Sequence, residues 1–79
     1  MARRAIVPAR RRQIVGENVR RYRREKGLSQ QEVANRMGVD RAYVSGLELG
    51  QRNPTVVTLW HAAQALKIEV HLLLREGTT

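Results

Sequence analysis

Apolar side chains recur at helical spacing through most of this chain. In residues 10–26, steps of three and four bring five side chains onto one face, namely Ile14, Val15, Asn18, Val19 and Tyr22. Gly27 follows this segment, and glycine is common just past the end of a helix. We therefore expect a first helix over residues 10–26, preceded by a flexible basic arm of residues 1–9.

A capping box marks the start of a second, short helix. Residues 29–32 read Ser-Gln-Gln-Glu, a pattern in which the serine and glutamate side chains each bond the other residue's backbone amide. The helix that begins here is predicted to run to Met37 and to end at Gly38. Only Gly38 and Val39 separate it from the next helical segment, so the two helices must be tightly linked.

Two further helices are predicted after this turn. Asp40 suits the N-cap of a helix over residues 41–48, and Thr55 suits the N-cap of one that runs to Leu66. A loop that contains glycine and proline separates them. The inner stripe of the last helix is expected to consist of Val56, Leu59, Trp60, Ala63 and Leu66.

The tail, residues 67–79, fits two structures. As a strand, it places four apolar side chains on one face, namely Ile68, Val70, Leu72 and Leu74. As a helix, it turns Val70, Leu73 and Leu74 inward. The alternation fits a period of two slightly better, so we expect a strand. These apolar side chains exceed what one small domain needs, so we also expect the tail to form the dimer interface.

Composition narrows the class of protein. Seventy-nine residues are enough for one compact domain, whose core is marginal without a partner subunit. We expect no secretory signal, and no membrane span because no run of about 18 apolar residues is present. Without cysteine there are no disulfides or thiolate metal sites. Together these features lead us to expect a cytoplasmic protein. His61 and His71 are isolated, so we expect no metal, no cofactor and no enzyme activity.

The net charge of +8 is concentrated at one end of the chain. Residues 1–26 hold ten basic and two acidic side chains, whereas residues 27–79 hold five of each. Such a block favours binding to nucleic acid over a merely solvated surface. Arg10, Arg11 and Arg12 are candidates for phosphate contacts, with solvated side chains as the alternative. RNA is disfavoured, because RNA modules depend on stacking aromatic side chains and this chain has three.

Two short helices joined by a tight turn make a helix-turn-helix. Ala34 must be small because the second helix crosses the first there, and Gly38 relieves the sharp reversal of the chain. The second helix keeps a free face that fits a DNA major groove, which is about 12 Å wide. This face consists of Arg41, Ala42, Ser45 and Gly46, flanked by Tyr43.

The same residues resemble the Cro/C1-type (Xre) helix-turn-helix family. The likeness rests on residues 28–34, 37–39, 44–48, 50 and 52–54, and it extends over about residues 14–68. It implies an all-α, lambda-repressor-like DNA-binding domain of four to five helices over residues 10–66, usually a dimer on operator DNA. Leu49 departs from the family, which usually has asparagine there.

The resemblance implies how the free face would read bases. Arg41 and Ala42 match the first base-facing positions, and Gly46 matches the next turn, although it has no side chain there. Arginine that bonds guanine at two points is worth about 1–3 kcal/mol of discrimination. Tyr43 and Ser45 complete the base-contacting set, with Tyr43 at the edge of the core as the alternative.

The resemblance also implies contacts that position the domain. Gln30 matches a residue that contacts phosphate or orients a recognition side chain. Arg52 and Asn53 lie in the loop expected to approach backbone phosphates. Arg23 and Glu48 match positions that form a partly buried ion pair.

We therefore predict a sequence-specific transcriptional regulator that places residues 41–48 in the major groove of double-stranded DNA. As a homodimer it would bind a pseudo-palindromic operator with half-sites about one helical turn apart. The alternative is an antitoxin or an adaptor whose main target is a toxin or the transcription machinery. In that case exposed apolar residues such as Leu49 and Leu72 would contact the partner.

Overall fold

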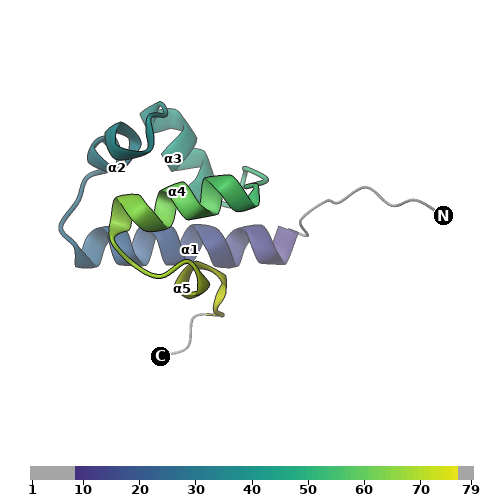
Figure 1. Cartoon of the computed structure of the whole chain (residues 1–79). Coiled ribbons are helices and arrows are strands. Elements are labelled where there is room, and N and C mark those ends of the chain that lie inside the picture. The colour runs from purple at the N-terminus through teal and green to yellow at the C-terminus, as the bar shows by residue number, and fades with distance from the viewer. Residues whose placement is uncertain (1–8, 77–79) are drawn as a thin grey trace.

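The computed structural model describes residues 9–76, which contain five helices and no strand. The helices are α1 (Ala9–Glu25), α2 (Gln30–Met37), α3 (Arg41–Glu48), α4 (Val56–Leu66) and α5 (His71–Leu74). Figure 1 shows α1 as the longest helix, with α4 alongside it and the α2–α3 pair and α5 on opposite sides. The all-α prediction is confirmed. The predicted arm lies outside the described residues, apart from Ala9, with which α1 begins.

Local signals in the sequence account for most helix ends. The Ser29 hydroxyl accepts a bond from the Glu32 amide at 3.0 Å, and the Glu32 carboxylate accepts one from the Ser29 amide at 2.8 Å. The bond from the Ser29 amide to the carboxylate, with a smaller contribution from the Ser29 side chain, holds the pKa of Glu32 below its usual value, because it favours the charged form. Thr55 caps α4 by accepting from the Thr58 amide at 3.1 Å. Asp40 occupies the N-cap of α3, as predicted, although its side chain forms no capping bond.

The core brings all five helices together. Val19 from α1, Val33 from α2 and Val44 from α3 are each 0% exposed, and Leu66 of α4 and Leu73 of α5 are buried to the same degree. Ala34 is also buried, as expected where α2 and α3 cross. Within residues 9–76, no helix combines the length and apolar character needed to cross a membrane.

The inner side of α4 differs from the predicted stripe. Trp60 and Val56 are 53% and 80% exposed, whereas Ala62 and Ala65 are buried. The helix is therefore rotated so that alanines join Leu59 and Leu66 against the rest of the domain. Small side chains let helices approach closely, and that packing outweighs the burial of one large aromatic ring at this position.

The tail is helical where a strand was expected, so that prediction is wrong. Leu73, the exception in the strand pattern, is completely buried in the domain core. Ile68 and Val70 also pack against this core, Leu72 is half-buried, and only Leu74, at 52%, is largely exposed. The tail up to residue 76 therefore completes its own domain, which removes most of the apolar surface expected at a dimer interface.

A buried asparagine holds the tail in place. Asn18 of α1 is 3% exposed, and its amide nitrogen donates to the carbonyl oxygens of Leu73 at 2.9 Å and Arg75 at 2.7 Å. These two bonds link the middle of α1 to the end of α5 and so fix the position of the tail. Asn18, expected on the apolar face of the first helix, thus has a specific partner there.

Candidate nucleic-acid interface

α3 is anchored on its inner side and open on its outer side. Val44 and Leu47 are 0% and 1% exposed and fix the helix against the core. Arg41 and Ala42 are exposed, and Ser45 is half-buried. Two open hollows flank the helix, one bordered by Ser45 and the other by Ala42. The outer side of α3 is therefore accessible to a groove-shaped partner.

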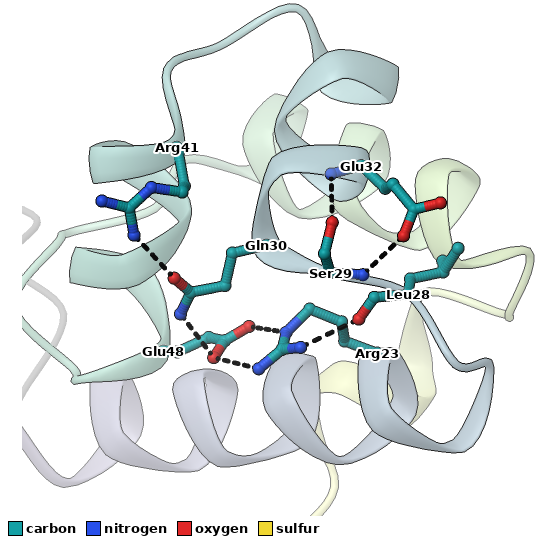
Figure 2. Close-up of polar contacts among 7 residues, drawn as sticks. All are labelled: Arg23, Leu28, Ser29, Gln30, Glu32, Arg41 and Glu48. Atoms are coloured by element: carbon teal, nitrogen blue, oxygen red, sulfur yellow. Dashed lines mark hydrogen bonds and ion pairs between the residues drawn. The ribbon is translucent and has the colours of Figure 1, made fainter.

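Figure 2 shows a chain of polar contacts that leads from this outer side into the domain. Arg41 Nη1 donates to Gln30 Oε1 at 3.3 Å, and Gln30 Nε2 donates to Glu48 Oε1 at 3.1 Å. Arg23 donates to both carboxylate oxygens of Glu48, at 2.6 and 3.1 Å, and to the carbonyl of Leu28 at 2.9 Å. Residues from three helices are thus joined in one network.

The ion pair at the centre of this network is the one that the family resemblance implied. The side chains of Arg23 and Glu48 are 13% and 4% exposed, so both charges are largely removed from water. The carboxylate receives three hydrogen bonds, which compensate for the solvation it has lost. Because a carboxylate can only accept, it also dictates that Gln30 turns its amide oxygen outward, toward Arg41.

Gly46 and Tyr43 do not lie as openly as the sequence suggested. Gly46 is buried, and the side chain of Arg52 lies next to it, so Gly46 is not part of the free face. Tyr43 is half-buried and packs against the edge of the core, which was the alternative for this residue. Part of its ring surface borders the hollow beside Ala42.

Apart from Gln30 at the start of α2, the predicted phosphate-contacting residues lie in two places. Arg52 and Asn53 are exposed in the loop between α3 and α4. Arg10, Arg11 and Arg12 form the first turn of α1. Arg10 contacts Glu76 at 3.3 Å, and Arg12 Nε donates to the carbonyl of Gly50 at 3.3 Å. Since Gly50 follows α3, the start of α1 lies near the end of the helix-turn-helix.

Arg20 is a candidate that the sequence analysis did not single out. It is exposed, and it borders the hollow that Gln30 and Ser45 also line. Arg20 precedes Arg23 by three residues, so both lie on the same side of α1. The predicted pairing of Arg23 with Glu48 was therefore a signal that Arg20 faces the same end of α3.

Arg36 was also missed, and its role is structural. Its Nη1 atom donates to the carbonyl of Ala65 at 2.8 Å, close to the C-terminus of α4. The contact satisfies a carbonyl near that helix end and links α2 to α4. No sequence pattern points to it, because the two residues are 29 positions apart.

Comparison with known proteins places this geometry in a family. A helix-turn-helix family profile, HTH_3, matches residues 19–73. The uncharacterized HTH-type transcriptional regulator y4dJ of Sinorhizobium fredii is 56% identical over 57 residues, which is 72% of this chain and 74% of that protein. The control protein C.SmaI of Serratia marcescens is 42% identical over 66 residues, 82% of this chain and 79% of that protein.

Solved structures agree with the sequence relatives. The restriction-modification controller protein C.AhdI of Aeromonas hydrophila superimposes with a TM-score of 0.76 at 44% identity. The match covers 78% of this chain and 94% of that one. The chain therefore belongs to the Cro/C1-type helix-turn-helix family, whose members are DNA-binding transcriptional regulators and not enzymes.

Proposed function

We propose that α3 enters the major groove of duplex DNA and that Arg41 reads a guanine there. The observation that carries this proposal is the contact between Arg41 and Gln30, which is itself bonded to the buried Glu48. These contacts hold the Arg41 guanidinium in a defined orientation, although the side chain is exposed. A guanidinium has five N–H groups, so enough donors remain to bond guanine at O6 and N7.

Residues near Arg41 would make the remaining contacts with DNA. Ala42, Tyr43 and Ser45 border the groove floor beside Arg41, and their exposed surface supports contacts with base edges or thymine methyl groups. Gly46 is left out because it is buried. The backbone phosphates would be contacted by Gln30, Arg10, Arg11, Arg12 and Asn53, joined by Arg20. Arg52 is left out of this set because its guanidinium lies over the Tyr43 ring.

We also propose that the protein dimerises through α4 rather than through the tail. α4 contains no charged residue between Val56 and Leu66, and it exposes Val56, Val57 and Trp60. Two copies that each carry a charge of +8 repel each other, so an uncharged apolar face is where they can approach at least cost. Exposed tryptophan is also typical of the centre of protein interfaces.

Selection from random duplexes tests the reading of bases. The full chain should enrich one sequence with guanine at a fixed position in each half-site. Arg41→Ala should lose about 1–3 kcal/mol of preference at that position, the value of one bidentate contact, and keep its binding to mixed-sequence DNA. Equal losses on selected and mixed duplexes would exclude base reading by Arg41. Thermal unfolding serves as the control, since replacement of the exposed Arg41 side chain should not change the unfolding temperature.

Sedimentation of two variants tests the dimer face. Trp60→Ala should shift the protein toward monomers, because it removes the largest exposed side chain of α4. Leu49→Ala is the matched control, since Leu49 is similarly exposed, at 62%, but lies outside α4. If Leu49→Ala dissociates the protein and Trp60→Ala does not, the subunits meet elsewhere.

Control of restriction-modification genes is a second candidate for the biological role. It is supported by the match to C.AhdI, which spans 94% of that controller, and by the similarity to C.SmaI. Genes for a restriction enzyme and a methyltransferase beside the coding sequence would favour this role. A toxin gene in that position would favour the antitoxin or adaptor alternative instead.

A further inference from the structure

Arg52 lies across the outer side of α3 and contacts Tyr43. Its guanidinium carbon is 5.1 Å from the centre of the Tyr43 ring, within the range of a cation–π contact. Both residues border the hollow that also includes Ala42 and Asp40 at the start of α3. The loop that follows α3 is thereby connected to the part of the helix that is proposed to face DNA.

Gly46 provides the space for this contact. A methyl group at Gly46 would lie 3.0 Å from Nε and 3.3 Å from Cγ of Arg52, closer than ordinary packing allows. Gly46 and Tyr43 are three residues apart and therefore neighbours on one side of the helix. Glycine within a helix costs about 1 kcal/mol relative to alanine. Its presence is explained if the stem of Arg52 must lie against the bare backbone.

We propose that Arg52 is a positioning residue for DNA sequence preference, because it holds the Tyr43 ring beside Ala42. This inference rests on the proposed entry of α3 into the major groove. The stem of Arg52 packs over Gly46, and its planar head covers the ring, so the ring keeps one orientation. The base step opposite Ala42 and Tyr43 then meets a fixed aromatic surface.

This role can be distinguished from a simple phosphate contact. A phosphate contact changes the affinity for all sequences alike and changes the dependence of binding on salt. A positioning residue changes the preference between sequences instead. If the stacking is lost, the preference should fall by about two- to fivefold, the population shift that an exposed cation–π contact corresponds to.

The first test needs no DNA. In the full chain, the NMR signals of the Arg52 δ-methylene protons should be shifted upfield by the Tyr43 ring. The shift should disappear in Tyr43→Leu and decrease in Gly46→Ala, whereas Tyr43→Phe should keep it. Unshifted signals in the unaltered protein would show that the contact does not persist in solution, and would overturn the inference.

The second test measures sequence preference. The probes are the duplex that the full chain enriches from a random pool, its single-base variants, and a mixed-sequence duplex of equal length. Arg52→Lys keeps the charge but lacks a planar group for stacking. Gly46→Ala removes no chemical group and displaces Arg52. Both should lower preference by about two- to fivefold at one base step and leave the salt dependence unchanged.

A third comparison assigns the effect to Tyr43. In a Tyr43→Leu background, Arg52→Lys should cause no further loss of preference, since the ring that it positions is absent. Gln51→Ala, at an exposed position of the same loop, is the matched control and should alter neither affinity nor preference. If the unaltered protein discriminates but Gly46→Ala and Arg52→Lys do so equally well, this inference alone fails. If the unaltered protein binds all duplexes equally, the proposed reading by α3 fails.

Discussion

Backbone lies against backbone on the inner side of α3, whereas a flexible side chain lies against its outer side. An added methyl group at Gly16 of α1 would lie 2.6 Å from the carbonyl oxygen of Glu48 and against that of Leu47. At Gly46, the nearest atoms to such a group all belong to the side chain of Arg52. Both glycines are buried, but only the neighbour of Gly46 can move aside.

This difference indicates how α3 can be anchored to the core on one side and present variable side chains to DNA on the other. The contact at Gly16 and the ion pair of Arg23 with Glu48 set the position of α3 relative to α1. The outer side carries groups that can change without moving the backbone. Substitutions on the inner side should therefore lower the free energy of unfolding, and substitutions on the outer side should change DNA preference.

The largest expected effect on the inner side comes from Glu48→Ala. It leaves the guanidinium of Arg23, which is 13% exposed, without its charged partner. We expect a loss of about 3–5 kcal/mol in the free energy of unfolding, measured with urea. Glu25→Ala, which breaks the exposed pair with Arg21, is the control and should change it by less than about 1 kcal/mol. Similar losses for the two variants would contradict the burial seen at Glu48.

Gly16→Ala should have the next largest effect. The new methyl group must push α1 and the C-terminal carbonyl groups of α3 apart, because neither backbone can rotate away. Overpacking of this kind costs about 1–3 kcal/mol, and we expect the upper end of that range in urea unfolding. An unchanged midpoint would mean that α1 and α3 are less closely packed than their carbonyl contacts indicate.

Asn18→Ala should have a smaller and more local effect. It removes both bonds that hold the carbonyl groups of Leu73 and Arg75, and leaves them without a donor from α1. The expected loss is about 1–3 kcal/mol, at the low end because Arg75 is exposed. Amide hydrogen exchange in α5 should accelerate more than exchange in α2. Uniform acceleration throughout the domain would show that α5 does not loosen separately.

Gly46→Ala should have the smallest effect on stability, and with the opposite sign. Alanine favours the helix by about 1 kcal/mol, and displacing the exposed side chain of Arg52 offsets part of this gain. Thermal unfolding should therefore show an equal or slightly higher midpoint, in contrast to Gly16→Ala. A clear loss of stability would show that the outer side of α3 is packed as tightly as the inner side.

Much of the helix-turn-helix could be predicted because its signals are local. The capping box of Ser29 and Glu32 and the glycine at the end of α2 depend on residues only a few positions apart. The pairing of Arg23 with Glu48 was available only through the family resemblance, since 25 positions separate the two residues. Arg52 was correctly assigned to a loop, but its contact with Tyr43 left no trace in the sequence pattern.

The tail and α4 show where periodicity was insufficient. The tail is so rich in apolar residues that a strand and a helix each bury a reasonable set, and the burial of Leu73 decides between them. In α4, both Trp60 and Ala62 fit an apolar stripe, and only the close approach of the neighbouring helices selects Ala62. Hydrophobicity alone ranks tryptophan as the better core residue, but it does not describe the space available.

The amino-acid sequence alone determined four helices, their caps, the helix-turn-helix and the concentration of positive charge near the N-terminus, because spacing and capping act over a few residues. The tertiary structure decided which side of α4 is buried, how the tail folds, and that Gly46 lies beneath Arg52. These features depend on volumes and on hydrogen bonds between residues far apart in the chain. Neither side-chain volumes nor long-range hydrogen bonds produce a periodic pattern in the sequence, because both take effect only where several helices pack together.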